Sequence, residues 1–311
     1  MLLSNVLNEY FPDAQVKFLN EREFDVLGLC GVYLGKRKLT FIDGVNYIDS
    51  ISNDTSMVLV TPEVADALVM KNTNIDFGIA ITSKPRILFF KIHNKLTLFD
   101  SNYKREEKDT IIGKDCKISI SAKIAGKNVV IGNNVQIDDF AVINENTVIG
   151  DNCKIGSGVK IGFADFEYKR DENTIFGVEH CGGVIIGHDV DILANTVVNK
   201  AVYPWDNTVI GNYTKIDMLC NISHGAKIGD NVMIVALSGI GGRTIIGNNS
   251  WVGYGAIIRN GITIGDNARV NMGSVVSKDV ESNESVTGNF AIEHNRFMEL
   301  LKKNAGKIEN D

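Results

Sequence analysis

Three residues of this chain have types and spacing that could carry out proton transfer. Asp206, His224 and Gly242 follow one another at equal intervals along the chain. If the fold stacks residues at this interval, the carboxylate can accept a hydrogen bond from one imidazole nitrogen and favour the charged imidazole. The glycine leaves a backbone N–H beside the reacting group, where it can stabilise an oxyanion, and Gly241 is the adjacent alternative. A surface histidine without a catalytic role is the competing interpretation of His224.

The interval matters because the middle of the chain repeats every six residues, and the three residues are spaced by three such hexads. β-Branched residues recur at this period in three series, from Ile131 to Ile161, from Ile186 to Val198 and from Ile210 to Val276. Most are followed by Gly, Asp, Asn or Ser, so each hexad is expected to form one short strand and one corner. A sandwich of short strands would vary its spacing over about 8–12 residues, and the constant period argues against it.

Two interruptions break the hexads. Between Ile161 and Ile186 the repeat gives way to a polar and aromatic segment, which we expect to leave the coils as a loop. At Pro204 one anchor is lost while the six-residue register is kept.

The segment before the repeat, residues 1–108, is predicted to be a separate α/β domain. We expect a helix from Ser4 to Tyr10, a strand and then a helix between Val58 and Leu68, and a buried strand from Arg86 to Ile92. A charged stretch around Lys104–Asp109 marks the boundary.

The hexads are assigned to residues 109–281, and the tail to residues 282–311. An amphipathic helix is expected from Ile292 to Lys303. We expect this tail to cap the last coil, because an uncapped solenoid end invites edge pairing.

Composition excludes several classes of protein. The 311 residues carry a formal charge of −6 with a pI near 5.5, which argues against nucleic-acid binding. Neither a signal peptide nor an apolar run long enough to span a membrane is present, so a soluble, cytoplasmic protein is expected. The cysteines lack CxxC spacing and are interpreted as reduced core residues: Cys30, Cys116, Cys153, Cys181 and Cys220.

The repeat resembles that of the hexapeptide-repeat family, whose members form a left-handed parallel β-helix with three hexads in each coil. The resemblance therefore implies a mostly β fold: this helix, an N-terminal α/β nucleotide-binding domain and a short C-terminal helical cap. It also implies a homotrimer, because members of the family commonly place their sites between subunits.

The segment Leu39–Tyr47 looks like the uridine-binding motif of the UDP-3-O-acylglucosamine N-acyltransferases. Phe41 and Tyr47 match the two aromatics that hold the base, and Asn46 lies within the motif, whereas Gly44 stands where those enzymes usually have Asn. The alternative is that both rings belong to a core. The resemblance continues through residues 180–187, 194–196, 206–211, 215–217 and 221–225.

What this resemblance implies is an N-acyltransferase with His224 as general base. A sugar amine would attack a pantetheine thioester directly, without a bound cofactor and without a covalent acyl-enzyme. Acyl-CoA is the favoured donor over acyl carrier protein. Residues assigned to the donor, for which solvated charges are the alternative interpretation, are Arg243, Arg259, Asn260 and Lys278, with Arg269 nearby.

Several functions remain open. The favoured acceptor is a UDP- or dTDP-linked amino sugar of cell-surface glycan biosynthesis. The lipid A enzyme itself, which acts on UDP-3-O-acylglucosamine with acyl carrier protein, is the alternative, although it has a second histidine where this chain has Asn260. A non-catalytic trimeric scaffold is another possibility. A zinc-dependent γ-type carbonic anhydrase is disfavoured because no close His-x4-His pair is present, so no metal is expected.

Overall fold

The computed structural model describes residues 1–71, 76–288 and 291–308. Its N-terminal part is a five-stranded sheet in the order β1-β5-β4-β3-β2, in which β1 is antiparallel to β5 and the other neighbours are parallel. The strands are β1 (Lys17–Asn20), β2 (Val26–Leu27), β3 (Lys38–Ile42), β4 (Thr55–Val60) and β5 (Gly78–Ile81). The helices are α1 (Leu3–Tyr10), the 3-10 helix η1 (Val45–Ser50), α2 (Pro62–Met70) and α3 (Pro85–Phe99).

Most of the elements predicted in this part are present, and one is wrong. α1, β4 and α2 lie where the sequence predicts them. The strand predicted from Arg86 to Ile92 is instead the first half of the helix α3, which has Pro85 in its first turn. Its buried residues recur at helical spacing and include Leu88, Ile92 and Leu96. So short an apolar stretch does not separate a buried strand from a buried helix.

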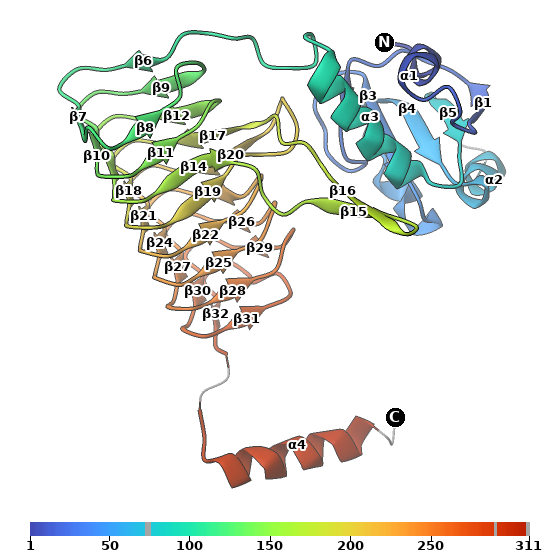
Figure 1. Cartoon of the computed structure of the whole chain (residues 1–311). Coiled ribbons are helices and arrows are strands. Elements are labelled where there is room, and N and C mark those ends of the chain that lie inside the picture. Colours follow the sequence, from blue (N-terminus) through green and yellow to red (C-terminus); the bar gives the residue numbers. More distant parts are fainter. Residues whose placement is uncertain (72–75, 289–290, 309–311) are drawn as a thin grey trace.

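The hexads form a left-handed parallel β-helix with three sheets along its length (Figure 1). The nine-stranded sheet contains β7 (Lys117–Ile118), β10 (Gln136–Ile137), β13 (Lys154–Ile155), β18 (Asp191–Ile192), β21 (Lys215–Ile216), β24 (Met233–Ile234), β27 (Trp251–Val252), β30 (Arg269–Val270) and β32 (Ser285–Val286). One eight-stranded sheet contains β8 (Lys123–Ile124), β11 (Val142–Ile143), β14 (Lys160–Phe163), β19 (Val197–Asn199), β22 (Asn221–Ile222), β25 (Gly239–Ile240), β28 (Ile257–Ile258) and β31 (Val275–Val276). The other contains β6 (Ile111–Ile112), β9 (Val129–Ile131), β12 (Thr147–Ile149), β17 (Gly183–Ile186), β20 (Asn207–Ile210), β23 (Lys227–Ile228), β26 (Ile245–Ile246) and β29 (Thr263–Ile264).

Most corners contain a left-handed residue three positions after an anchor, as at Asn134 after Ile131. Left-handed backbone, with φ between about 50° and 75°, recurs every six residues from Asn128 to Gly158 and again from Tyr213 to Gly273. Asn occupies more of these positions than any other residue type, because Asn and Gly adopt this conformation at low cost. Stacked Asn side chains also bond between coils, as between Asn128 and Asn146 at 3.1 Å.

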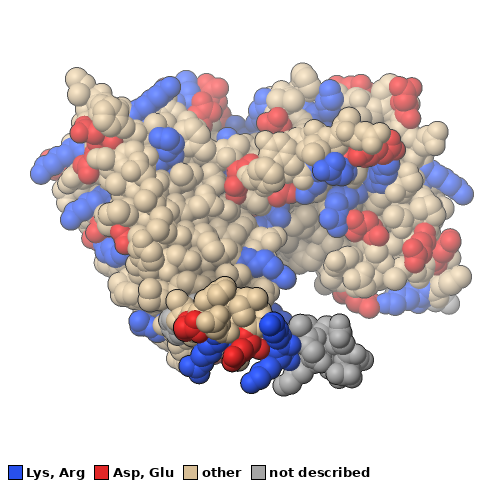
Figure 2. Space-filling model, turned by 60° about the horizontal axis from the view of Figure 1, so that its bottom comes forward, with Lys and Arg blue, Asp and Glu red and all other residues tan. Residues whose placement is uncertain are grey.

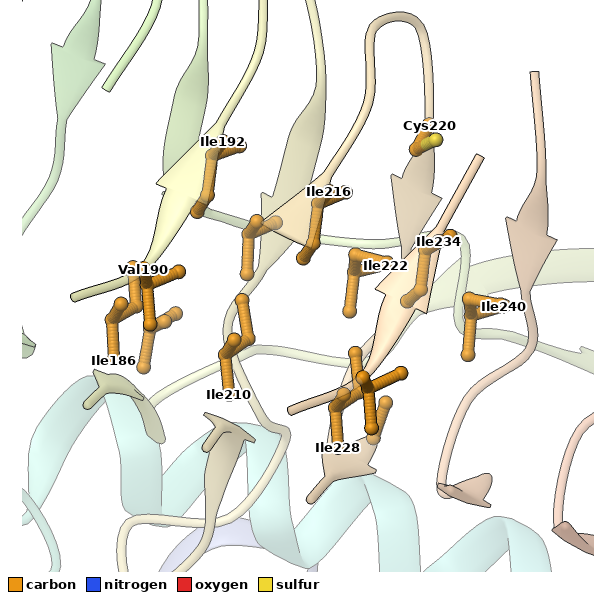
Figure 3. Close-up of a cluster of buried hydrophobic side chains, with 14 of the residues drawn as sticks. Ile186, Val190, Ile192, Ile210, Ile216, Cys220, Ile222, Ile228, Ile234 and Ile240 are labelled. Carbon is orange, nitrogen blue, oxygen red and sulfur yellow. The ribbon is translucent and has the colours of Figure 1, made fainter. Parts of the chain in front are cut away.

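The anchors fill the interior of the helix. In Figure 3 they project into one narrow core in stacked columns, among them Ile192, Ile216 and Ile234. The pairing of β20 with β23 and of β23 with β26 confirms that three hexads complete one coil. Sheets of strands only two to four residues long are therefore held by a continuous apolar column as well as by backbone hydrogen bonds.

Both interruptions are additions to single coils. Ile149 pairs with Ile186, because the intervening segment leaves the coil and forms the antiparallel hairpin of β15 (Tyr168–Asp171) and β16 (Thr174–Gly177). Ile186 then pairs with Ile210, so the coil that contains Pro204 is one hexad longer than a regular coil. The hexad around Pro204 thus keeps the register, as expected, but forms no strand of its own.

These two additions attach the N-terminal part to the coils. Val178, Val202 and Tyr203 belong to the same buried cluster as Phe89 of α3. The Trp205 Nε1–H donates to the Leu27 carbonyl at 2.8 Å. The hairpin lies along α3, as Figure 1 shows.

The C-terminal helix is present as α4 (His294–Ile308). Its described side chains, residues 294–303, are exposed, so they do not cover the last coil within this single chain; the capping role stays a prediction. β32 still pairs with β30, which extends the coils slightly beyond the predicted limit of residue 281. No described helix has the length and apolarity needed to cross a membrane. In the view of Figure 2, which turns the bottom of Figure 1 forward, acidic and basic side chains are scattered together over the surface.

Candidate active site

His224 lies at the corner between β22 and β23, and its side chain is 9% exposed. The predicted column is present. The Arg243 N–H donates to the His224 carbonyl at 2.9 Å, and the Gly261 N–H donates to the Gly242 carbonyl at 2.9 Å. A Cβ built on Gly242 would meet the imidazole at 2.6 Å, so the ring lies directly over this glycine.

Asp206 does not make the contact expected of it. It stacks one coil before His224, but its Oδ1 accepts from the Lys227 Nζ at 2.6 Å and from the Asn207 N–H at 2.8 Å. Stacking fixes the backbone register and leaves the side chain free to choose a partner. The prediction that Asp206 orients His224 is therefore wrong, because this carboxylate pairs with Lys227.

The carboxylate on His224 comes from the first interruption instead. Asp165 follows β14, at the point where the chain leaves the coil. Its Oδ2 lies 2.8 Å from the His224 Nδ1 and accepts the His224 backbone N–H at 2.9 Å. One oxygen thus fixes both the ring and the corner that carries it, which holds the tautomer with a proton on Nδ1.

A second carboxylate contacts the other ring nitrogen. The Glu167 Oε2 lies 3.2 Å from the His224 Nε2, and its Oε1 pairs with Lys169. The Lys169 Nζ in turn lies 4.4 Å from the centre of the Phe90 ring on α3. Both imidazole nitrogens consequently face ionised carboxylates, an arrangement suited to an imidazolium.

The pKa values of His224, Asp165 and Glu167 are shifted in the directions that these contacts favour. Burial lowers the pKa of His224, but the hydrogen bonds to Asp165 and Glu167 outweigh it and the net pKa is raised. Burial raises the pKa of Asp165, and the bonds from His224 outweigh it and hold that pKa well below its usual range. For Glu167 the same balance lowers the pKa to about 2. The site therefore favours the form of His224 that exists after proton uptake.

His180 supports this arrangement from the side. Its ring packs edge-on against His224 with centroids 5.6 Å apart. Its Nδ1–H donates to the Val178 carbonyl at 2.9 Å, while its Nε2 accepts the Asp165 backbone N–H at 3.4 Å. Burial, together with the charge of His224, lowers the pKa of His180 to about 4. A neutral His180 thus helps to position Asp165.

The structure separates the two glycines considered for the oxyanion. The Gly241 N–H donates to the Ile258 carbonyl at 2.9 Å and is unavailable. The Gly242 N–H donates to no acceptor in the part of the chain that the structure describes. Gly242 is therefore the glycine with a free donor beside the imidazole.

The residues predicted to bind the nucleotide lie at the end of β3 and in η1. Phe41 is half-buried and packs on Phe89 and Phe90, with centroids 5.0 and 5.9 Å away. Tyr47 is 50% exposed, and Asn46 is exposed. Phe41 thus packs partly against the core, whereas Tyr47 belongs to no buried cluster of the described residues. Base binding by these residues stays a prediction.

The residues predicted to bind the donor divide into two groups. Arg259, Asn260 and Lys278 are exposed on the later coils. Arg243 is half-buried beside His224, and its Nη2 is buried without a hydrogen-bond partner in the described residues. The positive charge of Arg243 is close enough to help lower the pKa of Glu167.

Among the described residues, no group of three or more His, Cys, Asp or Glu side chains is arranged so that it could hold a metal ion. Cys153 and Cys220 are buried within the coils, and burial raises the pKa of both thiols.

Sequence reasoning missed Asp165 and Glu167 as site residues. The repeat assigns neighbours only within the hexads, and both carboxylates lie in the segment that leaves them. One signal was available: a long insertion in a regular coil, with two acidic residues at its start, is the kind of loop that carries function.

Comparison with known proteins agrees with the repeat and with the family resemblance. A family described as bacterial transferase hexapeptide (six repeats) matches residues 128–162, 207–242 and 243–278. UDP-3-O-acylglucosamine N-acyltransferase 2 of Legionella pneumophila is 43% identical over 79 residues, which are 25% of this chain and 22% of that protein. UDP-3-O-acylglucosamine N-acyltransferase 1 of Francisella tularensis is 46% identical over 79 residues, which are again 25% of this chain and 22% of that protein. This chain thus matches about a fifth of the length of these relatives.

Solved structures with similar coils include a UDP-N-acetylglucosamine acyltransferase from Campylobacter jejuni, 23% identical with a TM-score of 0.48, over 58% of this chain and 68% of that one. The family match identifies the matched coils as hexapeptide repeats of the bacterial transferase type. Among proteins with this repeat, the chain resembles the UDP-3-O-acylglucosamine N-acyltransferases, as its motifs indicated.

Proposed function

We propose that this protein is an N-acyltransferase that moves an acyl group from a pantetheine thioester to the amine of a nucleotide-linked amino sugar. The observation that carries the proposal is the arrangement around His224: Asp165 on Nδ1, a raised pKa, and the free N–H of Gly242 beneath the ring. The names of the relatives support the substrate class.

Each residue has a defined part in this reaction. His224 Nε2 takes a proton from the attacking amine, and Asp165 stabilises the imidazolium that forms. The Gly242 N–H stabilises the oxyanion of the tetrahedral intermediate. His224 then gives its proton to the departing thiolate. The transition state carries the charges that this site favours, so no covalent acyl-enzyme is needed.

The contacts of the first interruption support a nucleotide-linked acceptor. Glu167 pairs with Lys169, Lys169 lies on Phe90, and Phe90 packs against Phe41. These contacts connect Phe41, which we propose for the base, to the carboxylate on the His224 Nε2. We propose Phe41, Asn46 and Tyr47 for the base, and Arg243 with Arg259, Asn260 and Lys278 for the donor.

Acyl-CoA as donor, a UDP or dTDP carrier and a homotrimer complete the proposal. The second candidate is the lipid A enzyme itself, because the relatives are named for the UDP-3-O-acylglucosamine reaction. Its donor would be acyl carrier protein.

The test is a screen that measures thiol release. UDP- and dTDP-linked sugars with an amine at C2, C3 or C4, together with UDP-3-O-acylglucosamine, are combined with acyl-CoAs and with acyl carrier protein thioesters. Transfer to an amino sugar that lacks the 3-O-acyl chain supports the main proposal. Transfer confined to UDP-3-O-acylglucosamine selects the second candidate, and no thiol release with any pair contradicts both.

A further inference from the structure

Glu167 contacts the same nitrogen of His224 that must accept the proton of the acceptor. Asp165 occupies the Nδ1 of His224, so Nε2 is the nitrogen that must face the acceptor. Yet Nε2 lies 3.2 Å from Glu167, whose side chain is only 12% exposed. Hydrogen bonding to His224 and Lys169 keeps this carboxylate ionised despite its burial. A buried charge at the nitrogen that does the chemistry needs a partner when the acceptor arrives.

The number of protons on the nucleophile offers a way to satisfy both groups. An attacking amine has two N–H bonds, whereas a hydroxyl has one O–H. If one proton faces the His224 Nε2, an amine still has a second for a neighbouring acceptor. A hydroxyl in the same place has none, and it would direct a lone pair at the carboxylate.

We propose that Glu167 recognises the acceptor's amine by accepting the N–H that His224 does not take, and so selects amines over hydroxyls. This inference rests on the proposed function, and the feature of the substrate that it concerns is the second N–H of the amine. In the chain without substrate, the protonated His224 Nε2 donates to the same oxygen, the Oε2 of Glu167.

The step balances with this assignment. The amine lone pair attacks the thioester carbon, the C=O electron pair moves to oxygen beside Gly242, and one N–H proton passes to the His224 Nε2. Collapse restores C=O, breaks C–S, and returns that proton to sulfur. The second N–H stays on nitrogen throughout and becomes the amide N–H. Glu167 can therefore hold it from substrate to product, and its charge favours the cationic nitrogen formed between them.

Lys169 and Phe90 orient the Glu167 carboxylate. The Glu167 Oε1 is held by Lys169, which lies over the Phe90 ring, so the Oε2 is the oxygen that faces His224. Glu167 therefore reaches the site in a fixed orientation set by the hairpin and α3.

The experiment compares Glu167→Gln with the wild-type chain on paired acceptors. Each amino sugar accepted in the screen is measured for kcat and KM, and its hydroxyl counterpart is measured both as acceptor and as competitive inhibitor. Glu172→Gln is the matched control, because Glu172 lies in the same hairpin, pairs with Lys84 and is far more exposed. Thermal melting verifies that each variant folds.

Loss of a charge-assisted hydrogen bond should lower kcat/KM for the amine by about 10- to 100-fold, mainly through kcat. The inhibition constant of the hydroxyl counterpart should stay within about threefold or fall, because a glutamine amide can donate to the lone pair that the carboxylate opposes. Every value for Glu172→Gln should change less than about threefold. Two results would overturn the inference: an unchanged kcat/KM for the amine, or an equal loss for amine turnover and hydroxyl binding. Neither contradicts the acyltransferase proposal, which fails only if the wild-type chain releases no thiol.

Discussion

The regular coils and the two segments that interrupt them divide the work of this molecule. The coils supply a rigid column in which His224 lies over Gly242. The first interruption supplies both carboxylates that contact the imidazole, and the second supplies Tyr203 and Trp205, which join the coils to the N-terminal part. The regular coils thus position His224, and the first interruption provides the carboxylates that raise its pKa.

This division has a physical reason. Each hexad offers few outward positions, and the strands of the coils are only two to four residues long, so a coil can present a side chain but cannot surround it. A segment that leaves the coil can fold back over the corner and exclude water from it. His224 is accordingly mostly buried although it lies at a corner of the coils, and Asp165 of the covering segment is buried with it.

Removal of the base should have the largest effect. His224→Ala is expected to lower kcat by at least about a thousandfold, because general-base catalysis and the charge pairing with Asp165 are lost together. Thiol release measures the rate. Circular dichroism and thermal melting should remain close to those of the wild-type chain; full activity in a folded variant would end the proposed mechanism.

The two aspartates give the sharpest contrast between an interruption and a coil. Asp165→Asn should reduce kcat/KM by about 100-fold or more, since the imidazolium loses its counter-charge and its tautomer is no longer fixed. Asp206→Asn should cost less than about fivefold, because this carboxylate pairs with Lys227. Steady-state kinetics on the acceptor found in the screen makes the comparison, and the reverse order of effects would restore Asp206 as the orienting group.

A methyl group under the imidazole should displace it. Gly242→Ala places a Cβ 2.6 Å from the ring of His224, so the ring must move away from the oxyanion position. A loss of about 10- to 100-fold in kcat is expected from such a misplacement. Gly126→Ala is the control, because a Cβ there meets no atom within 4 Å. Equal rates for the two variants would count against the stacked arrangement.

The anchoring of the hairpin should show the smallest effect on stability. Lys84 and Lys91 both pair with Asp171, at 2.7 and 2.6 Å, and both are more than 40% exposed. Lys84→Ala should change the free energy of unfolding by less than about 1 kcal/mol. Ile222→Ala, inside a coil, should cost about 2–5 kcal/mol. Chemical denaturation of both variants tests this difference between a surface pair and a core anchor.

The reach of sequence reasoning follows the same division. The period of six predicted the coils, their corners and the column of His224 and Gly242, because stacking is a property of the repeat. It could not predict Asp165, since the path of an aperiodic loop depends on where the loop packs. It also misled for Asp206, where the backbone stacks as predicted but the side chain turns to Lys227. In α3, a short apolar run concealed a helical period.

The central claim is that Asp165, from an interruption, sets the charge of His224. Titration of labelled histidine by NMR in the wild-type chain, Asp165→Asn and Asp206→Asn tests it without any substrate. The raised pKa of His224 means that the imidazolium persists above the usual value and that base activity appears as pH rises through the raised pKa. Asp165→Asn should lower this pKa and move the onset of base activity to lower pH, whereas Asp206→Asn should leave the pKa in place. A pKa that falls in Asp206→Asn and stays unchanged in Asp165→Asn would contradict the account.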